Sequence, residues 1–204
     1  MSPMIPDMEN YFREFIPRRD ALLLALEEEA ARESIPIVGP VVGELLHLLA
    51  RATGARNILE LGTASGYSGI YLARALPPGG RLVSLELSAE MASRARTNFL
   101  KAGVAERVEV RQGQALDLMA AMEVTFDLIF LDIDKESYAP ALPHCHRLLK
   151  VGGLLIADNV GFAGADAFNR EIFGQPSWRA VHLLAFLPQH SPERDGLSLA
   201  VRVE

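Results

Sequence analysis

From Asn57 onward, short apolar runs alternate with longer stretches of helical character, and this alternation restricts the fold more than any other feature. The runs with the length and composition of buried strands are NILEL (57–61), RLVSLE (81–86), RVEVR (107–111), FDLIFLD (126–132) and GLLIAD (153–158). The stretches between them, such as SAEMASRARTNFLKAG, carry apolar residues at helical spacing. Strict alternation of strand and helix predicts βαβ units, and therefore a parallel sheet with helices on both faces.

Two further apolar runs, WRAVHLLAF (178–186) and LSLAVRV (197–203), close the chain and are joined differently. The loop between them is short and contains Pro188, Pro192 and Gly196. A short loop joins antiparallel strands, whereas parallel strands need a crossover of about a dozen residues or more. We therefore expect an antiparallel hairpin at one edge of the sheet.

The segment before Asn57 carries helical patterns only. Asp20 precedes an apolar-periodic stretch and suits the N-cap of a helix. Pro36 and Pro40 then break the pattern, which resumes over residues 41–53. No linker or low-complexity tract follows, so we expect one domain over residues 1–204, made of a helical N-terminal segment (1–53) and an α/β core (54–204).

Composition excludes several classes of protein. The net charge of −6 argues against a nucleic-acid partner, which usually meets a basic surface. No apolar run approaches the roughly 20 residues that span a bilayer, and the first residues lack the apolar core of a secretory signal. A single cysteine, Cys145, excludes an internal disulfide and fits a reducing compartment. We expect a cytoplasmic protein with no membrane partner.

Acidic residues stand at the ends of four predicted strands: Glu60, Glu86, Asp132 and Asp158. Ligands of open α/β sheets bind outside the carboxyl ends of the strands, so parallel strands would gather these carboxylates along one rim. An unpaired charge after an apolar run is costly, which indicates that each acid has a partner or a ligand. The alternative is that these acids merely cap the helices that follow.

The turn Glu60-Leu61-Gly62-Thr63-Ala64-Ser65-Gly66-Tyr67-Ser68-Gly69 follows the first predicted strand. Its glycines allow a tight turn and a close approach to a ligand. Its spacing matches neither the G-x-G-x-x-G motif of dinucleotide-binding proteins nor the P-loop motif. The sequence therefore disfavours a dinucleotide or nucleoside-triphosphate site, and with it a nicotinamide oxidoreductase. An acidic rim attracts the sulfonium and ammonium of S-adenosylmethionine (SAM) and repels a pyrophosphate. Glu86, 24 positions after Gly62, stands where such folds bind ribose hydroxyls.

A third group of polar residues follows two later strands: Asp132 begins the run Asp132-Ile133-Asp134-Lys135, and Asp158 precedes Asn159. Carboxylate and amide oxygens suit a hard divalent cation such as Mg²⁺, with Mn²⁺ and Ca²⁺ as alternatives. Lys135 lies three positions past Asp132, within reach of a substrate oxygen held there. An amine can give up its proton in such a place and a guanidinium cannot, which favours Lys135 as a base in a chain where most cations are arginine. The alternative is a solvated lysine paired with Asp134 or Glu136.

Histidines and aromatic residues give weaker signals. His144 and His146 face apart on a helix and make a poor metal pair. The remaining histidines are interpreted as ordinary core or surface residues: His47, His182 and His190. Several aromatic residues could contact a substrate but are more often core: Tyr67, Tyr71, Phe162 and Trp178.

Taken together, ILELGTASGYSGIYLA, SLE, FLDIDKESY and IADNV resemble the cation-dependent class I O-methyltransferases, of the caffeoyl-CoA and bacterial type rather than the animal catechol type. The resemblance runs from about Ile37 to the C-terminal hairpin. It implies a Rossmann-like fold with a seven-stranded, mostly parallel sheet whose last strand is antiparallel. It also implies transfer of a methyl group from SAM to a catechol-like small molecule, and a homodimer.

The resemblance assigns roles to individual residues. SAM would be bound by Val38, Glu60, Gly62, Thr63, Ser68, Glu86, Ala115 and Asp134. The cation would be bound by Asp132, Asp158 and Asn159, and Lys135 would act as the catalytic base.

The chain departs from the family pattern downstream of Asn159, where Val160-Gly161-Phe162 replaces a usual tryptophan. The stretches 166–176 and 188–194 also differ, and both are expected to border the acceptor pocket. Two other functions stay open: a metal-independent methyltransferase for another small molecule, and a non-catalytic subunit that binds the donor.

Overall fold

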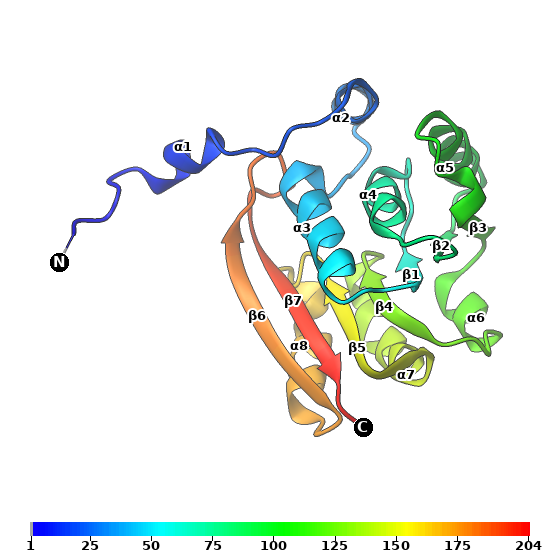
Figure 1. Cartoon of the computed structure of the whole chain (residues 1–204). Helices are drawn as coiled ribbons and strands as arrows, with labels where there is room; N and C mark the ends of the chain where they lie inside the picture. The colour runs from blue at the N-terminus through cyan, green and yellow to red at the C-terminus, as the bar shows by residue number, and fades with distance from the viewer. Residues whose placement is uncertain (1) are drawn as a thin grey trace.

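A computed structural model describes residues 2–204 and contains a seven-stranded sheet between two layers of helices (Figure 1). The strands are β1 (Asn57–Leu61), β2 (Arg81–Glu86), β3 (Val108–Gln112), β4 (Phe126–Leu131), β5 (Leu149–Ala157), β6 (Trp178–Phe186) and β7 (Arg194–Arg202). The α-helices are α1 (Met8–Arg13), α2 (Ala21–Glu33), α3 (Gly39–Ala52), α4 (Tyr67–Ala75), α5 (Ala89–Lys101), α6 (Ala115–Ala120), α7 (Tyr138–Leu148) and α8 (Asp166–Gly174).

The strand order is β3-β2-β1-β4-β5-β7-β6. Neighbours from β3 to β5 pair in parallel, and β7 pairs antiparallel with both β5 and β6. The predicted α/β fold with an antiparallel last strand is confirmed, and so is the C-terminal hairpin at the sheet edge. Since the chain leaves β1 toward β2 on one side and reaches β4 on the other, the carboxyl ends of β1 and β4 form the switch point where ligands bind in such sheets.

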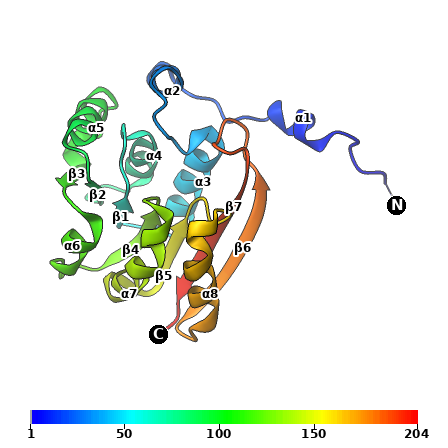
Figure 2. The same ribbon diagram turned by 180° about the vertical axis from the view of Figure 1, so that it is seen from behind.

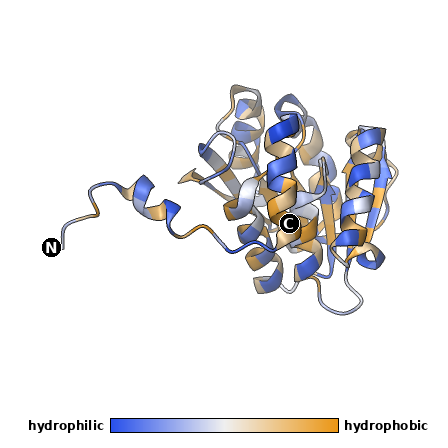
Figure 3. Ribbon diagram, turned by 90° about the horizontal axis from the view of Figure 1, so that it is seen from above, coloured by the Kyte–Doolittle hydropathy of each residue, from blue (hydrophilic) through white to orange (hydrophobic). Residues whose placement is uncertain are grey.

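Alternate side chains of each central strand enter different cores. Ile58 of β1 and Phe130 of β4 pack with helices α2 to α5, whereas Leu59 and Ile129 pack with α6, α7 and α8. Because both faces are covered, the strands are apolar along almost their whole length. Figure 3 shows the apolar strands between helices whose outer faces are hydrophilic, and Figure 2 shows α6, α7 and α8 in front of the sheet.

The N-terminal segment confirms one predicted boundary and corrects another. The Asp20 carboxylate caps α2 by accepting from the Leu23 N–H at 2.9 Å. Pro40 does not break a helix, because it stands in the first turn of α3, where its missing N–H has no partner to lose. α1 projects from the helices that cover the sheet (Figure 1), and it contacts the β6–β7 hairpin, where Arg13 pairs with Glu193 and Glu9 with Arg194. Within residues 2–204, no helix has the length and apolar character needed to cross a membrane.

Candidate functional site

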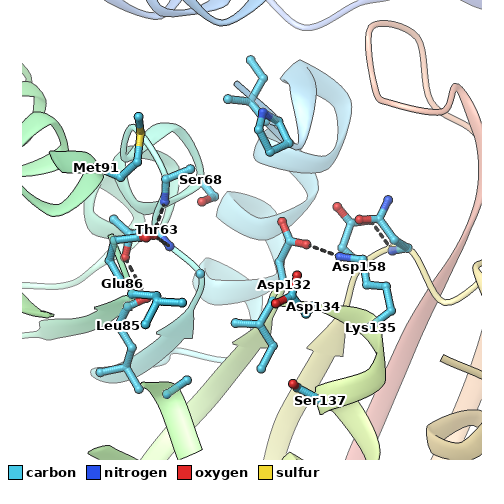
Figure 4. A pocket seen from close by; sticks show the side chains of 18 of the residues that line it. Thr63, Ser68, Leu85, Glu86, Met91, Asp132, Asp134, Lys135, Ser137 and Asp158 are labelled. Atoms are coloured by element: carbon cyan, nitrogen blue, oxygen red, sulfur yellow. Dashed lines mark hydrogen bonds and ion pairs between the residues drawn. The ribbon is translucent and has the colours of Figure 1, made fainter. Parts of the chain in front are cut away.

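A cavity of about 860 Å³ opens at the carboxyl ends of the five parallel strands, β1 to β5. The loops after these strands line it, together with the α2–α3 linker and the β6–β7 loop. Figure 4 shows Thr63, Ser68 and Glu86 on one side and Asp132, Lys135 and Asp158 on the other. We call these two parts the Glu86 end and the Asp158 end. A volume of this size is typical of pockets for small molecules and cofactors.

The four strand-end acids do gather at this rim, but they do not all face the cavity. Glu86, Asp132 and Asp158 line it, whereas Glu60 does not. The alternative that the acids cap the following helices is wrong, because the N-cap residues there are Gly66, Ser88, Ser137 and Ala165.

Packing within the protein, more than contact with a ligand, requires glycine at positions 62 and 66 of the first turn. Gly62 has φ = 91°, and a Cβ there would lie 1.9 Å from the backbone oxygen of Asp132. Gly66 also has positive φ, and a Cβ there would lie 3.1 Å from the ring of Phe99. Gly62 lines the cavity but Gly66 does not. Close packing of β1 against β4 and of α4 against α5 therefore explains these glycines better than the close approach of a ligand does.

Glu86 ties this turn to the end of β2. Its Oε2 accepts from the backbone N–H groups of Thr63 (3.2 Å) and Ala64 (2.8 Å), and its Oε1 accepts from that of Ser88 (2.8 Å). Apolar residues line the cavity beside it: Leu85, Leu87, Met91 and Leu116. A carboxylate next to an apolar slot suits a hydroxylated sugar joined to a flat ring.

Glu60 lies behind the cavity wall. It is fully buried, and its carboxylate accepts from the hydroxyls of Ser68 (2.6 Å) and Ser84. Burial raises the pKa of Glu60 to about 7. Direct contact of Glu60 with a donor, as the sequence predicted, therefore has no support in this geometry, whereas Ser68 in front of it lines the cavity.

Most of the other residues predicted to bind the donor line the cavity, and one does not. The cavity is lined by Gly62, Thr63, Ala115 and Asp134. Val38 is buried outside the lining, while its neighbours Pro36 and Ile37 belong to it. Contact of the Val38 backbone with the donor therefore stays a prediction.

Lys135 lies at the Asp158 end and pairs with Asp132, not with Asp134 or Glu136. Its Nζ donates to Asp132 Oδ1 at 2.7 Å and to the hydroxyl oxygen of Tyr138 at 3.0 Å. The lysine is therefore not a solvated cation paired with Asp134 or Glu136; its side chain is 19% exposed. The Tyr138 hydroxyl in turn donates to the backbone oxygen of Asp158 at 2.9 Å. Tyr138 was missed by sequence reasoning, although its spacing of three from Lys135 was a usable signal.

Asp158 is held by a histidine that sequence reasoning set aside. His190 Nε2 lies 2.9 Å from Asp158 Oδ2, and its Nδ1 lies 2.8 Å from the backbone oxygen of Pro192. Burial disfavours the charged imidazole, but the Asp158 carboxylate more than offsets this, and the pKa of His190 is raised. His190 is buried, as a core histidine would be, but it also lines the cavity and contacts Asp158, so the interpretation as an ordinary core or surface residue missed its place in the site.

Oxygen atoms at this end suit a divalent cation. Burial raises the pKa of Asp132, the Lys135 ammonium opposes this, and the neighbouring Asp158 charge adds to it. A cation between the two carboxylates would offset both burial and repulsion. Residues 2–204 hold no group of three histidine, cysteine, aspartate or glutamate side chains that could bind a metal. A third oxygen must therefore come from elsewhere, and Asn159, next to Asp158 in the lining, has one.

The divergent segments have different positions. The β6–β7 loop lines the cavity through His190 and Ser191, as expected of the stretch 188–194. The stretch 166–176 does not line it, because most of it forms α8, which packs against α7 and β6. Of the four aromatic residues considered, Tyr67 and Phe162 line the cavity, while Tyr71 and Trp178 are core.

Comparison with known proteins gives one consistent family. The model of the family described as "O-methyltransferase" matches residues 18–172. The catechol O-methyltransferase of Niastella koreensis is 39% identical over 159 residues (75% of this chain and 72% of that protein). That of Mycobacterium tuberculosis is 41% identical over 161 residues (78% and 73%). The crystal structure of an O-methyltransferase from Bacillus cereus in complex with SAH superposes with a TM-score of 0.86 at 34% identity, covering 96% of both chains.

Proposed function

The chain belongs to the O-methyltransferase family, and from this premise we propose that it methylates a hydroxyl of a catechol-like small molecule with the help of a divalent cation. As a member of this family, the protein is a SAM-dependent O-methyltransferase. The acceptor class, the cation and the residue roles are the proposal.

The Glu86 end supports the donor part of the proposal. Glu86 would bind the ribose hydroxyls, because a carboxylate that accepts three backbone N–H groups still has acceptor capacity toward the cavity. Ala115 and the apolar residues beside Glu86 would surround the adenine. Ser68 and Thr63 would bind the amino-acid part, and the negative charge of Asp134 would favour the sulfonium.

The Asp158 end supports the cation part. Asp132, Asp158 and Asn159 would hold the cation, since hard divalent cations prefer carboxylate and amide oxygens. When bound, the cation would act as a Lewis acid that makes an acceptor hydroxyl easier to deprotonate.

The protein side chains supply the remaining chemistry. Lys135 Nζ, once neutral, would take the proton of the acceptor hydroxyl, and Asp132 and Tyr138 keep that nitrogen in place. The walls of one cavity hold the donor and the acceptor together, which converts a bimolecular reaction into one between positioned groups. The observation that carries the proposal is that Lys135 and both carboxylates face the same cavity as Glu86 (Figure 4).

Turnover of a panel of catechols, flavonoids and acyl-CoA phenols, measured with SAM in Mg²⁺ and in chelator, tests the proposal. We expect methylation of at least one vicinal diol, its loss in chelator and its return with added Mg²⁺. Undiminished turnover in chelator would contradict the cation role and favour a metal-independent methyltransferase. SAM binding without transfer to any acceptor would favour a non-catalytic subunit.

A further inference from the structure

Asp195 lies at the start of β7, behind the Asp158 end and outside the cavity lining. It is 3% exposed. Its Oδ2 accepts from Asn159 Nδ2 at 2.6 Å. Its Oδ1 accepts from the backbone N–H groups of Gly196 (2.6 Å) and Gly161 (3.2 Å). All of these partners are donors, so the carboxylate is held from three sides as an acceptor.

This contact decides how the amide of Asn159 is turned. A carboxylate only accepts hydrogen bonds, so the NH₂ group of Asn159 must face Asp195 and its carbonyl oxygen must face the other way. Asn159 lines the cavity and Asp195 does not, so the oxygen is directed to the cavity side. Within residues 2–204 no protein group donates to that oxygen.

The backbone around the contact is shaped to allow it. Asn159 has φ = 51°, a left-handed conformation that asparagine tolerates better than most residues. A Cβ at Gly161 would lie 2.6 Å from Asp195 Oδ1, so a larger residue there would push the carboxylate away.

We propose that Asp195 is a positioning residue, which selects the orientation of the Asn159 amide that offers oxygen rather than nitrogen to the cation. This inference rests on the proposed function, since it concerns the same cation. The terminal bond of an asparagine side chain has only a weak orientational preference of its own. Without Asp195, the amide could turn its NH₂ group to the cavity, and an NH₂ group does not bind a hard cation.

The variant Asp195→Asn provides the sharpest test. The new side chain still accepts from Gly161 and Gly196 through its oxygen, so its NH₂ group faces Asn159 and makes that amide reverse. We expect Mn²⁺ affinity, measured by calorimetry or electron paramagnetic resonance on donor-free protein, to fall about 10- to 100-fold. SAM affinity and thermal stability serve as controls and should change little.

The double variant Asp195→Asn with Asn159→Asp exchanges the two side-chain types and keeps the net charge. The carboxylate at position 159 then accepts from the amide at position 195 and offers its other oxygen to the cation. We expect this exchange to return Mn²⁺ affinity close to the wild-type value, which a purely structural role of Asp195 would not explain. Wild-type Mn²⁺ affinity in Asp195→Asn, or no recovery in the double variant, would overturn the proposal.

A second readout separates this inference from the proposed function. The side-chain NH₂ protons of Asn159, observed by nuclear magnetic resonance, should be protected from exchange in the wild type and exposed in Asp195→Ala, with or without metal. Equal exchange in both proteins would overturn the orientation role even if Mn²⁺ binds. A wild-type protein that binds no Mn²⁺ would overturn the cation site, and the role of Asp195 toward it, whatever the exchange result.

Discussion

At the Glu86 end of the cavity, one carboxylate binds the backbone N–H groups of a turn that follows the neighbouring strand. At the Asp158 end, carboxylates bind side chains that arrive from far along the chain: His190 is 32 positions from Asp158, and Asp195 is 36 positions from Asn159. The first arrangement depends on backbone shape and the second on side-chain identity. Changes at the two ends should therefore have separate effects, one on donor affinity and the other on metal binding and transfer.

Replacing Lys135 should produce the largest change and should leave the Glu86 end untouched. We expect Lys135→Met to lower kcat by about 10²- to 10⁴-fold, because the proton acceptor is lost. Lys135→Arg should be similarly inactive, because a guanidinium keeps the pair with Asp132 but does not release its proton. SAM affinity by calorimetry should be unchanged in both.

Lys150 offers a matched control, since its Nζ donates to Asp127 Oδ1 at 2.6 Å away from the cavity. Lys150→Met should keep wild-type kcat. High activity in Lys135→Arg would contradict the role of base.

A substitution at Gly62 should affect both ends of the cavity, because the turn at the Glu86 end packs here against the Asp132 backbone of the Asp158 end. A Cβ there would overlap the Asp132 backbone oxygen, so we expect Gly62→Ala to lower the free energy of unfolding by about 3 kcal/mol or more and to impair both SAM and Mn²⁺ binding. Gly54 also has positive φ but no atom within 4 Å of such a Cβ, so Gly54→Ala should cost only about 1 kcal/mol. Equal losses in urea unfolding would show that backbone strain, and not the contact with β4, explains the glycine.

Glu60 allows a pH test of the buried layer behind the Glu86 end. Its folded pKa of about 7 exceeds the unfolded value of 4.5, so between these pH values the folded state binds more protons than the unfolded state. Stability from this group is therefore present below pH 4.5 and is lost as pH rises to about 7, by up to about 3 kcal/mol. Urea unfolding of donor-free Glu60→Gln should lack this decline relative to wild type. If the free energies of unfolding of Glu60→Gln and wild type changed with pH in parallel, a raised pKa of Glu60 would be refuted.

The smallest predicted effect concerns Glu86. Glu86→Gln exchanges charge-assisted hydrogen bonds to the turn for weaker ones, so SAM affinity should fall about tenfold while Mn²⁺ affinity stays the same. Glu109 on β3 is paired with Arg111 and does not line the cavity, so Glu109→Gln serves as the control. A loss of Mn²⁺ binding in Glu86→Gln would show that the two ends are coupled.

The contrast between the two ends of the cavity also explains which features could be predicted from the sequence. The strand alternation predicted the fold, and the acids at the strand ends predicted the rim, because both depend on residues close together in the chain. The burial of Glu60 behind Ser68 could not be predicted, since a strand pattern does not tell which acid the neighbouring serines will cover. His190 and Asp195 were missed because their partners are set by how a loop of 187–193 returns to the sheet, and no local pattern in the sequence encodes that return.

The most direct test of the account is a paired measurement on Asp158→Ala, in which SAM affinity and turnover of a neutral catechol are determined in the same Mg²⁺ buffer. We predict SAM affinity close to that of the wild type, because Asp158 belongs to the other end of the cavity, and turnover lower by on the order of 10²-fold or more, because a ligand of the cation is lost. Wild-type turnover in this variant would contradict the account, and so would a parallel loss of SAM affinity.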